Sequence, residues 1–385
     1  MHRLLPPSLG LLFALGCPAQ TFVVDANNGP GTNFTTLTAA VAAVPSGSVL
    51  SVRAGIYAGV TIDAMSLEIL GEPGARIDAQ PGSNSKVVSV VNLQPAQRVR
   101  VSGFELSTTS YYYAVTAESV NCQGLVCFED LRCVTSTQVY ISLRFVNSDR
   151  VLVRDVTSNT GWVGATCQQS NVSFEDCRLG VPLAGPVGSA APLYVTGGSV
   201  QLANSSVRAS GGFSSHAVSM QGGELRLLGT TVLTAGAPPP PPLWWVPHEL
   251  AGSGTVRLDP SVTLTTGMVE AGITVVTQAM PSLRSSGTAT TIDAELTGPN
   301  SALGAIAVSL PGPRVVLPLF QDAVWLDGSS LIWVGLGVLG PSLPVTGWLP
   351  WTIGPAPGLV AVWQGVVFDP ATGWQVSNPS LAVLP

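Results

Sequence analysis

One short pattern recurs eight times along this chain: an apolar residue, any residue, an apolar residue, any residue, and then usually Gly, Asp or Asn. The alternation predicts a strand with one buried face. Gly, Asp and Asn all tolerate the left-handed backbone region, so the fifth position predicts a bend. The eight copies begin at Leu67, Val99, Val126, Val151, Val172, Val200, Leu225 and Val256, and only the last departs at its fifth position, with Pro260.

Successive copies are 21 to 32 residues apart, and this spacing indicates a solenoid. Its strands would stack in parallel about 4.8 Å apart, so the two inward residues of each coil meet those of the coils above and below. Helical repeats of similar length would show a 3.6-residue period, which is absent. We therefore predict an all-β chain in which residues 21–280 form a parallel β-helix, opened by a short capping helix at Thr38 to Val44.

The composition agrees with many short strands and tight turns. Only 10% of the residues are charged, against about 25% in an average soluble domain, while 42 Gly and 31 Pro are present. The net charge of −6 and the lack of a basic stripe argue against nucleic acid as a partner. The most apolar late stretch, residues 330–351, contains prolines and glycines that would break a spanning helix, so we predict no transmembrane span.

The N-terminus predicts export. A positive start, an apolar run from Leu4 to Leu15 and small residues up to Ala19 form a signal peptide over residues 1–19. The alternative is that Cys17 belongs to a degenerate lipoprotein signal and carries a lipid. In either case we expect a secreted or cell-surface protein. At most two disulfides could form, with pairing that the sequence leaves open, among Cys122, Cys127, Cys133, Cys167 and Cys177.

Charged residues repeat along the predicted solenoid. Stacking puts Glu129, Arg154 and Glu175 in one outward register, as a column of alternating charge, and Asp130, Asp155 and Asp176 in the next register. The structural interpretation is a solvated row of turns beside weak surface ion pairs. The functional interpretation is a Ca²⁺ site formed by the three aspartates with Glu175.

Two aromatic clusters are candidates for binding sugar rings. Trp244 and Trp245 follow a run of five prolines, which holds an extended, stiff segment. Tyr111 and Tyr112 lie in the sequence SYYYAV between two coils. The alternative for both clusters is ordinary packing against the solenoid. His216 follows two serines, but no Gly-x-Ser-x-Gly elbow occurs, so a serine triad is not indicated.

Residues 34–71 resemble a known family. This segment contains the predicted helix, then VLSVRAGIY and VTIDAMSLEILG. It resembles the opening coil of the pectin methylesterase and pectate lyase-like superfamily, which implies a right-handed parallel β-helix. The Gln-Ala-Val, Gln-Asp and Asp-Phe-x-x-Gly motifs of the esterases are missing between Val99 and Leu258. Esterase chemistry is therefore not supported.

The resemblance also implies a possible lyase. Polysaccharide lyases of this fold use Ca²⁺ on clustered carboxylates together with an Arg or Lys base. By chemistry alone, Arg154 or Arg178 would be the base here, and the ligands would be Asp130, Asp155, Asp176 and Glu175. No lyase motif aligns with the chain.

After Met280 the repeat stops, and residues 281–385 form runs typical of strands, separated by Gly and Pro. We predict a β-sandwich. The final 28 residues resemble a terminal module of secreted and surface proteins of environmental bacteria, which implies attachment or secretion. Most of its tryptophans are expected in the core: Trp325, Trp333, Trp348, Trp351, Trp363 and Trp374.

Two functions follow from the sequence. The first is a non-catalytic secreted or cell-surface protein that needs no cofactor and uses the long sheet flank of the solenoid to bind extracellular polysaccharide or neighbouring cell-surface components. The second is a polysaccharide lyase or other carbohydrate-active enzyme assisted by Ca²⁺. A groove that holds the aspartates with an Arg facing them would favour the enzyme.

Overall fold

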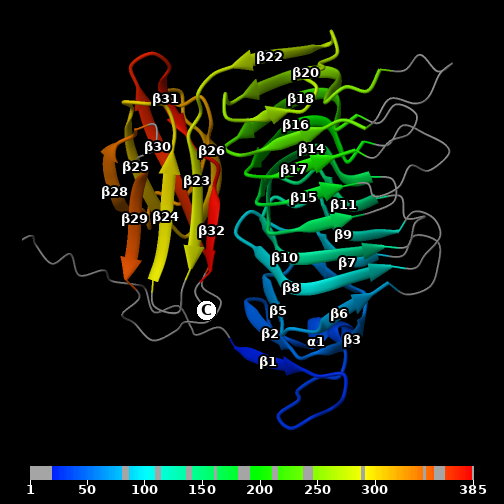
Figure 1. Cartoon of the computed structure of the whole chain (residues 1–385). Helices are drawn as coiled ribbons and strands as arrows, with labels where there is room; N and C mark the ends of the chain where they lie inside the picture. Colours follow the sequence, from blue (N-terminus) through cyan, green and yellow to red (C-terminus); the bar gives the residue numbers. More distant parts are fainter. Residues whose placement is uncertain are drawn as a thin grey trace, which may run out of the picture.

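The structure is a computed structural model that describes residues 20–79, 86–108, 114–135, 141–159, 163–180, 191–209, 216–236, 246–287, 291–340, 344–350 and 360–383. Two all-β parts lie side by side along much of their length, a long solenoid and a smaller sandwich (Figure 1). Within the described residues, no helix is long and apolar enough to cross a bilayer.

The solenoid is a parallel β-helix with three faces, and its long strands bend from one face onto the next. The first face contains β1 (Thr21–Val24), β2 (Ser48–Val52), β5 (Leu67–Gly71), β8 (Arg98–Thr108), β10 (Leu125–Thr135), β12 (Arg150–Arg154), β14 (Val163–Glu175), β16 (Leu193–Ala203), β18 (Val218–Leu228), β20 (Leu250–Leu258) and β22 (Ile273–Thr277). We call this face the flank.

The other two faces complete each coil. The second contains β3 (Gly55–Ala58), β6 (Ala75–Asp78), β13 (Thr157–Asn159), β15 (Arg178–Gly180), β17 (Ser206–Arg208), β19 (Val232–Thr234) and β21 (Thr263–Leu264), together with the ends of β8 and β10. The third contains β4 (Val60–Asp63), β7 (Lys86–Val91), β9 (Val115–Val120) and β11 (Ile141–Val146), followed by the beginnings of β14, β16, β18 and β20.

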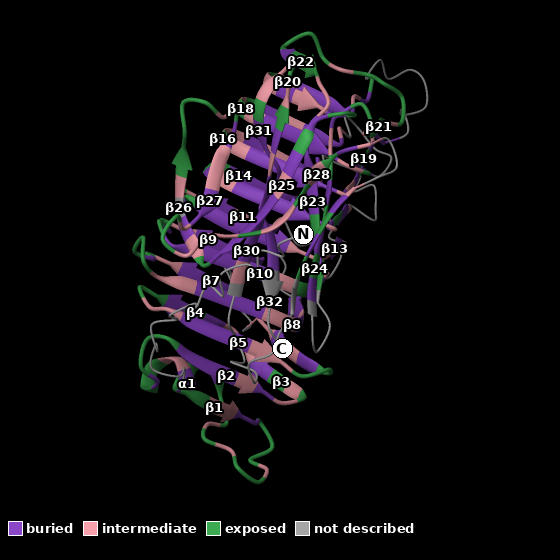
Figure 2. Cartoon of the chain, turned by 90° about the vertical axis from the view of Figure 1, so that its left-hand side faces the viewer, coloured by how far each residue is buried: buried purple, intermediate pink, exposed green. Residues whose placement is uncertain are grey.

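The predicted register is confirmed at every step. Each of the eight predicted strand starts is paired directly with the next, from Leu67 opposite Val99 through to Leu225 opposite Val256. Apart from the half-buried Leu258, their inward residues are almost completely buried, and their side chains belong to one continuous core (Figure 2). A one-residue slip of a strand would turn its inward side chains outward and expose them to water. The free-energy cost of that exposure explains why the pattern is so regular.

The predicted bends are also confirmed. The fifth position of the repeat has a positive φ in six of the eight copies, at Gly103, Asp130, Asp155, Asp176, Asn204 and Gly229. The φ of Asp155 is 50°, in the left-handed region that Asp and Asn enter at modest cost. Gly71 instead continues its strand, and glycine is needed there because a Cβ would lie 2.5 Å from the carbonyl oxygen of Gly103.

Aromatic rings stack in the middle of the core. The ring centroids of Phe128 and Phe145 are 6.2 Å apart, and those of Phe145 and Phe174 are 6.0 Å apart. All three rings are completely buried. The five cysteines in the described residues are buried as free thiols, so none of the disulfides that the count permits is formed.

A short helix covers the first coils. Helix α1 runs from Leu37 to Ala43, and the hydroxyl of Thr36 accepts a hydrogen bond from the Ala39 N–H at 3.2 Å as its N-cap. Leu37 and Ala40 are buried in the solenoid core. The helix therefore closes the N-terminal end of the stack, which would otherwise expose apolar side chains to water.

The C-terminal part is a sandwich of antiparallel sheets. The sheet in the order β23–β24–β29 contains Ser282–Gly287, Thr291–Thr297 and Val345–Pro350. The second sheet contains β28 (Ile332–Val338), β25 (Leu303–Ser309), β30 (Val360–Asp369), β31 (Gly373–Val376) and β32 (Ser380–Val383). A separate hairpin joins β26 (Pro311–Val316) to β27 (Ala323–Leu326). Apolar side chains from both sheets form the core between them.

The expectation that most tryptophans are buried is wrong for this part. Trp325 and Trp363 are buried, but Trp333, Trp348 and Trp374 are 56%, 60% and 40% exposed. Trp351 lies outside the described residues. The exposed indoles are on strand positions that face away from the sandwich core, so the alternation of each strand decides their placement.

We expect the phenylalanine stack to stabilise the solenoid strongly. Phe145→Ala should lower the free energy of unfolding by about 3–5 kcal/mol, because it leaves a cavity between two further rings. Ile56→Ala is the control, since Ile56 is 65% exposed and should cost less than about 1 kcal/mol. Urea denaturation followed by circular dichroism measures both values, and equal losses would contradict this account of the core.

Candidate functional site

The sandwich covers the middle of the solenoid flank. Leu125, Cys127 and Leu152 on the flank pack against Trp325, Leu326, Val362 and Leu381 of the C-terminal part. The guanidinium of Arg150 donates to the carbonyl oxygen of Gly312, across the same junction. In Figure 1, β23, β26 and β32 are drawn beside the solenoid. The long sheet flank, proposed from the sequence as a glycan-binding surface, is therefore covered in its middle by the sandwich, and its use as a binding surface stays a prediction.

The alternating-charge column exists, but it is largely enclosed, with Glu175 buried and the side chains of Arg154 and Glu129 14% and 13% exposed. Glu129, Arg154 and Glu175 are direct neighbours in register. Arg154 lies 3.9 Å from Glu129 and donates to two carbonyl oxygens of the sandwich, that of Ser285 at 2.7 Å and that of Leu381. The interpretation as weak surface ion pairs is wrong for this column, because docking of the sandwich removes it from water.

Glu175 is the most deeply enclosed carboxyl group of the column. Its side chain accepts a hydrogen bond from the Ser380 hydroxyl at 2.8 Å, and the residue is 3% exposed. Burial raises the pKa of Glu175 to about 8, although Arg154 and the Ser380 hydrogen bond act in the opposite direction. The carboxyl group is therefore largely protonated at neutral pH, at the contact between the two parts.

The row of aspartates lies at the edge of the flank, in the turns that follow it. Arg284 of β23 binds Asp176, with 3.1 Å between Nε and Oδ2, and Arg154 Nε lies 3.5 Å from Asp155. Burial raises the pKa of Asp155, and so does the nearness of Asp176 and Asp130. In the described part of the chain, no group of three or more acidic, His or Cys side chains converges as a metal site would require. The Ca²⁺ site stays a prediction.

A cleft separates this edge of the solenoid from the sheet β23–β24–β29. Its volume is about 420 Å³, and we call it the acidic cleft. Asp293 and Trp348 are directly opposite each other on β24 and β29, and both are exposed. The lining residues are Arg154, Asp155, Asp176, Arg284, Ser285, Ser286, Asp293, Ala294, Glu295, Thr346, Gly347 and Trp348.

The acidic cleft combines three kinds of contact. The indole of Trp348 offers a flat apolar face, the carboxylates accept hydrogen bonds, and the guanidinium of Arg284, which is 65% exposed at its side chain, donates them. A sugar ring presents an apolar face and hydroxyl groups that both donate and accept. The arrangement is therefore chemically suited to a glycan.

The structure brings together only part of the site predicted from the sequence. Asp155, Asp176 and Arg154 line the acidic cleft, whereas Asp130 lines a neighbouring open hollow that shares only Asp155 with the cleft. Arg178 is exposed on β15 and does not line the acidic cleft. Glu175 is buried and does not line the cleft either. The remaining candidates lie outside the described residues and stay predictions: Tyr111, Tyr112, Trp244 and Trp245.

Sequence reasoning missed the sandwich side of the cleft. Asp293 and Glu295 alternate with the buried Ile292, Ala294 and Leu296, which marks them as outward-facing. This alternation is visible in the sequence. The sequence does not show which coil of the solenoid this face packs against, because no local pattern encodes how the two parts dock.

Comparison with known proteins gives only distant likenesses. No protein-family model and no curated protein matches the chain. The pectin methylesterase of Aspergillus niger is 14% identical, with a TM-score of 0.36, over 68% of this chain and 81% of that one. Tailspike protein 2 of an Escherichia coli O157:H7 bacteriophage is 8% identical, with a TM-score of 0.34, over 94% and 68%.

A third solved structure is similar at the same low level. It is a tailspike protein, a capsular polysaccharide depolymerase, from an Acinetobacter baumannii bacteriophage. Its identity is 12% and its TM-score is 0.24, over 86% of this chain and 81% of that one. The assignment of the parallel β-helix depends on the strand register of this chain itself.

Glu175 should make the stability of the protein depend on pH. Its pKa is about 8 in the folded state and 4.5 in its ordinary environment, so between these values the folded state holds a proton that the unfolded state lacks. The free energy of unfolding should therefore fall as pH rises through this window, by up to about 1.4 kcal/mol per pH unit from this group. Glu175→Gln should remove this contribution.

Denaturant unfolding at several pH values from 5 to 8 measures the slope. Glu295→Gln is the matched control, because Glu295 is an exposed acid of the nearby cleft. That variant should keep the slope of the parent protein. An unchanged slope in Glu175→Gln would show that the buried carboxyl group is not its source.

Proposed function

We propose that this chain is a secreted or cell-surface protein that binds a polysaccharide in the acidic cleft without cleaving it. The observation that carries the proposal is the exposed indole of Trp348 in a cleft lined by carboxylates and by Arg284. Sites between two packed parts of a chain are a common location for ligands. The export signal expected over residues 1–19 supports the location outside the cell.

The charges of the cleft favour a neutral glycan. Four carboxylates line it against two guanidinium groups, and both of the latter are already paired, Arg284 with Asp176 and Arg154 with Asp155. An excess of negative charge repels a polyanion, whereas hydroxyl groups donate well to carboxylates. We therefore expect neutral polysaccharides to bind better than acidic ones when no divalent cation is present.

The alternative is a carbohydrate-active enzyme of the lyase type. One observation favours it: Arg284 lines the same cleft as Asp155 and pairs with Asp176 at 3.1 Å, although Arg284 belongs to the sandwich and is not one of the bases suggested by the sequence. Incubation with acidic polysaccharides, with and without Ca²⁺, tests this function through the ultraviolet absorbance of an unsaturated product. Product that requires Ca²⁺ would favour the lyase over the binding protein.

Replacement of the indole should weaken glycan binding. Trp348→Ala should lower the affinity for a neutral polysaccharide about fivefold or more, because it removes the apolar face on which a sugar ring stacks. Affinity electrophoresis against a panel of neutral and acidic polysaccharides measures the change.

Trp374→Ala is the matched control. Trp374 is also exposed, but it lies on β31 against Phe368 and Phe320, away from the acidic cleft. This variant should bind like the parent protein. Equal losses in the two variants, or retention on acidic polysaccharides alone, would contradict the proposed site.

A further inference from the structure

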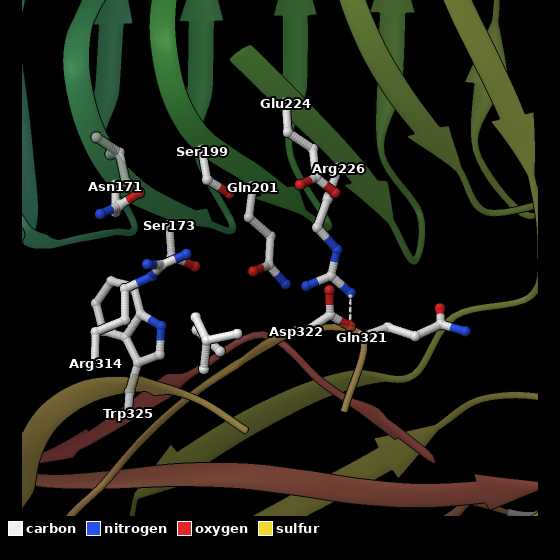
Figure 3. Close-up of a pocket in the computed structure, with 13 residues that line it drawn as sticks. Asn171, Ser173, Ser199, Gln201, Glu224, Arg226, Arg314, Gln321, Asp322 and Trp325 are labelled. Atoms are coloured by element: carbon white, nitrogen blue, oxygen red, sulfur yellow. Dashed lines mark ion pairs between the residues drawn. The ribbon is translucent and has the colours of Figure 1, made fainter. Parts of the chain in front are cut away.

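A second cavity lies between the flank and the β26–β27 hairpin, and we call it the junction pocket (Figure 3). Its volume is about 240 Å³, small for a ligand pocket. Figure 3 shows Gln201 reaching into its centre, with Ser173 and Arg314 on one side and Arg226 with Asp322 on the other. None of these five residues lines the acidic cleft.

The charges around the pocket leave one guanidinium unbalanced. Arg226 pairs with Asp322 at 2.7 Å, and both side chains are 6% exposed. Glu224 pairs with Arg257 at 2.8 Å. The remaining charged residue in the lining is Arg314, which makes no ion pair or hydrogen bond with any other residue that the structure describes.

Buried hydrogen-bond donors of the pocket also lack partners. Among the described residues, nothing accepts from the amide nitrogen of Gln201, from Nε of Arg226 or from the hydroxyl of Ser173. These three residues are 8%, 5% and 2% exposed. A buried donor without an acceptor is costly, so such groups in proteins normally have a partner. Oε1 of Glu224 also makes no hydrogen bond, but it is held by the ion pair with Arg257. The unpartnered donors therefore suit a ligand with several acceptor atoms.

We propose that the junction pocket binds a small organic carboxylate. The two oxygens of a carboxylate accept from a guanidinium in the paired geometry that Arg favours, and they supply charge to balance Arg314. The amide of Gln201 and the hydroxyl of Ser173 provide further donors on the buried side. The small volume excludes a polymer chain, so this ligand differs from the polysaccharide of the acidic cleft.

Isothermal titration calorimetry of the full chain with gluconate tests the proposal. Sorbitol is the matched neutral probe, because it replaces the carboxylate by a hydroxymethyl group on the same skeleton. Gluconate should bind with a dissociation constant on the order of millimolar, and sorbitol at least about tenfold more weakly. Arg314→Gln should weaken gluconate binding about tenfold or more, and Arg314→Lys less than that.

Two control variants separate this site from other effects. Arg178→Gln removes the same charge from an exposed position on β15, so gluconate binding should be unchanged. Trp348→Ala alters only the acidic cleft, so it should also leave gluconate binding intact even if the proposed glycan function fails. The melting temperature of each variant establishes whether it is folded. If Arg314→Gln does not fold, Gln201→Leu provides a second test of the pocket.

Three results would overturn the proposal. Failure of gluconate to bind would mean that the pocket holds water only. Equal binding of gluconate and sorbitol would exclude a carboxylate site. Gluconate binding that survives both Arg314→Gln and Gln201→Leu in folded protein would place the ligand elsewhere on the chain.

Discussion

Stacking of inward side chains from coil to coil is the interaction on which this molecule depends. No single coil can bury its own apolar residues, so each is stable only between two neighbours. The direct pairing of Val126, Val151, Val172 and Val200 shows how strictly the coils keep register. The bends follow the stacked strands at a fixed position. The aspartates of successive turns therefore form a row even though no contact between the aspartates holds them there.

The sequence was sufficient to predict the strands and bends of the solenoid, because local side-chain and backbone preferences determine them. Alternation located the strands, and the preference of Asp, Asn and Gly for positive φ located the bends. The functional region could not be predicted in the same way, because it arises where a second part of the chain docks on the flank. Arg284 and Asp176 are 108 residues apart in sequence, and no periodic pattern links them.

The tryptophans show where a general tendency misleads. Large aromatics are buried on average, but the alternation of each strand decides the outcome. Trp348 shares its strand with the inward-facing Val345 and therefore faces out. Trp363 is buried, and so is its neighbour Val362 on the opposite side of β30, because β30 is covered on both faces, by the other sheet and by the solenoid flank.

Docking also gives the junction two cavities of different character, the acidic cleft and the junction pocket with its unbalanced guanidinium.

The contact between Glu175 and the last strand has a consequence for the order of events during folding. Coils of the repeat contact neighbours only 21 to 32 residues away, so the solenoid is able to wind progressively as the chain emerges. Ser380 is 205 residues beyond Glu175. The hydrogen bond from Ser380 can therefore form only after the chain has been made as far as this residue, whereas each coil has its neighbours much earlier. Because burial at this contact raises the pKa of Glu175, docking of the sandwich on the coils should be coupled to uptake of a proton.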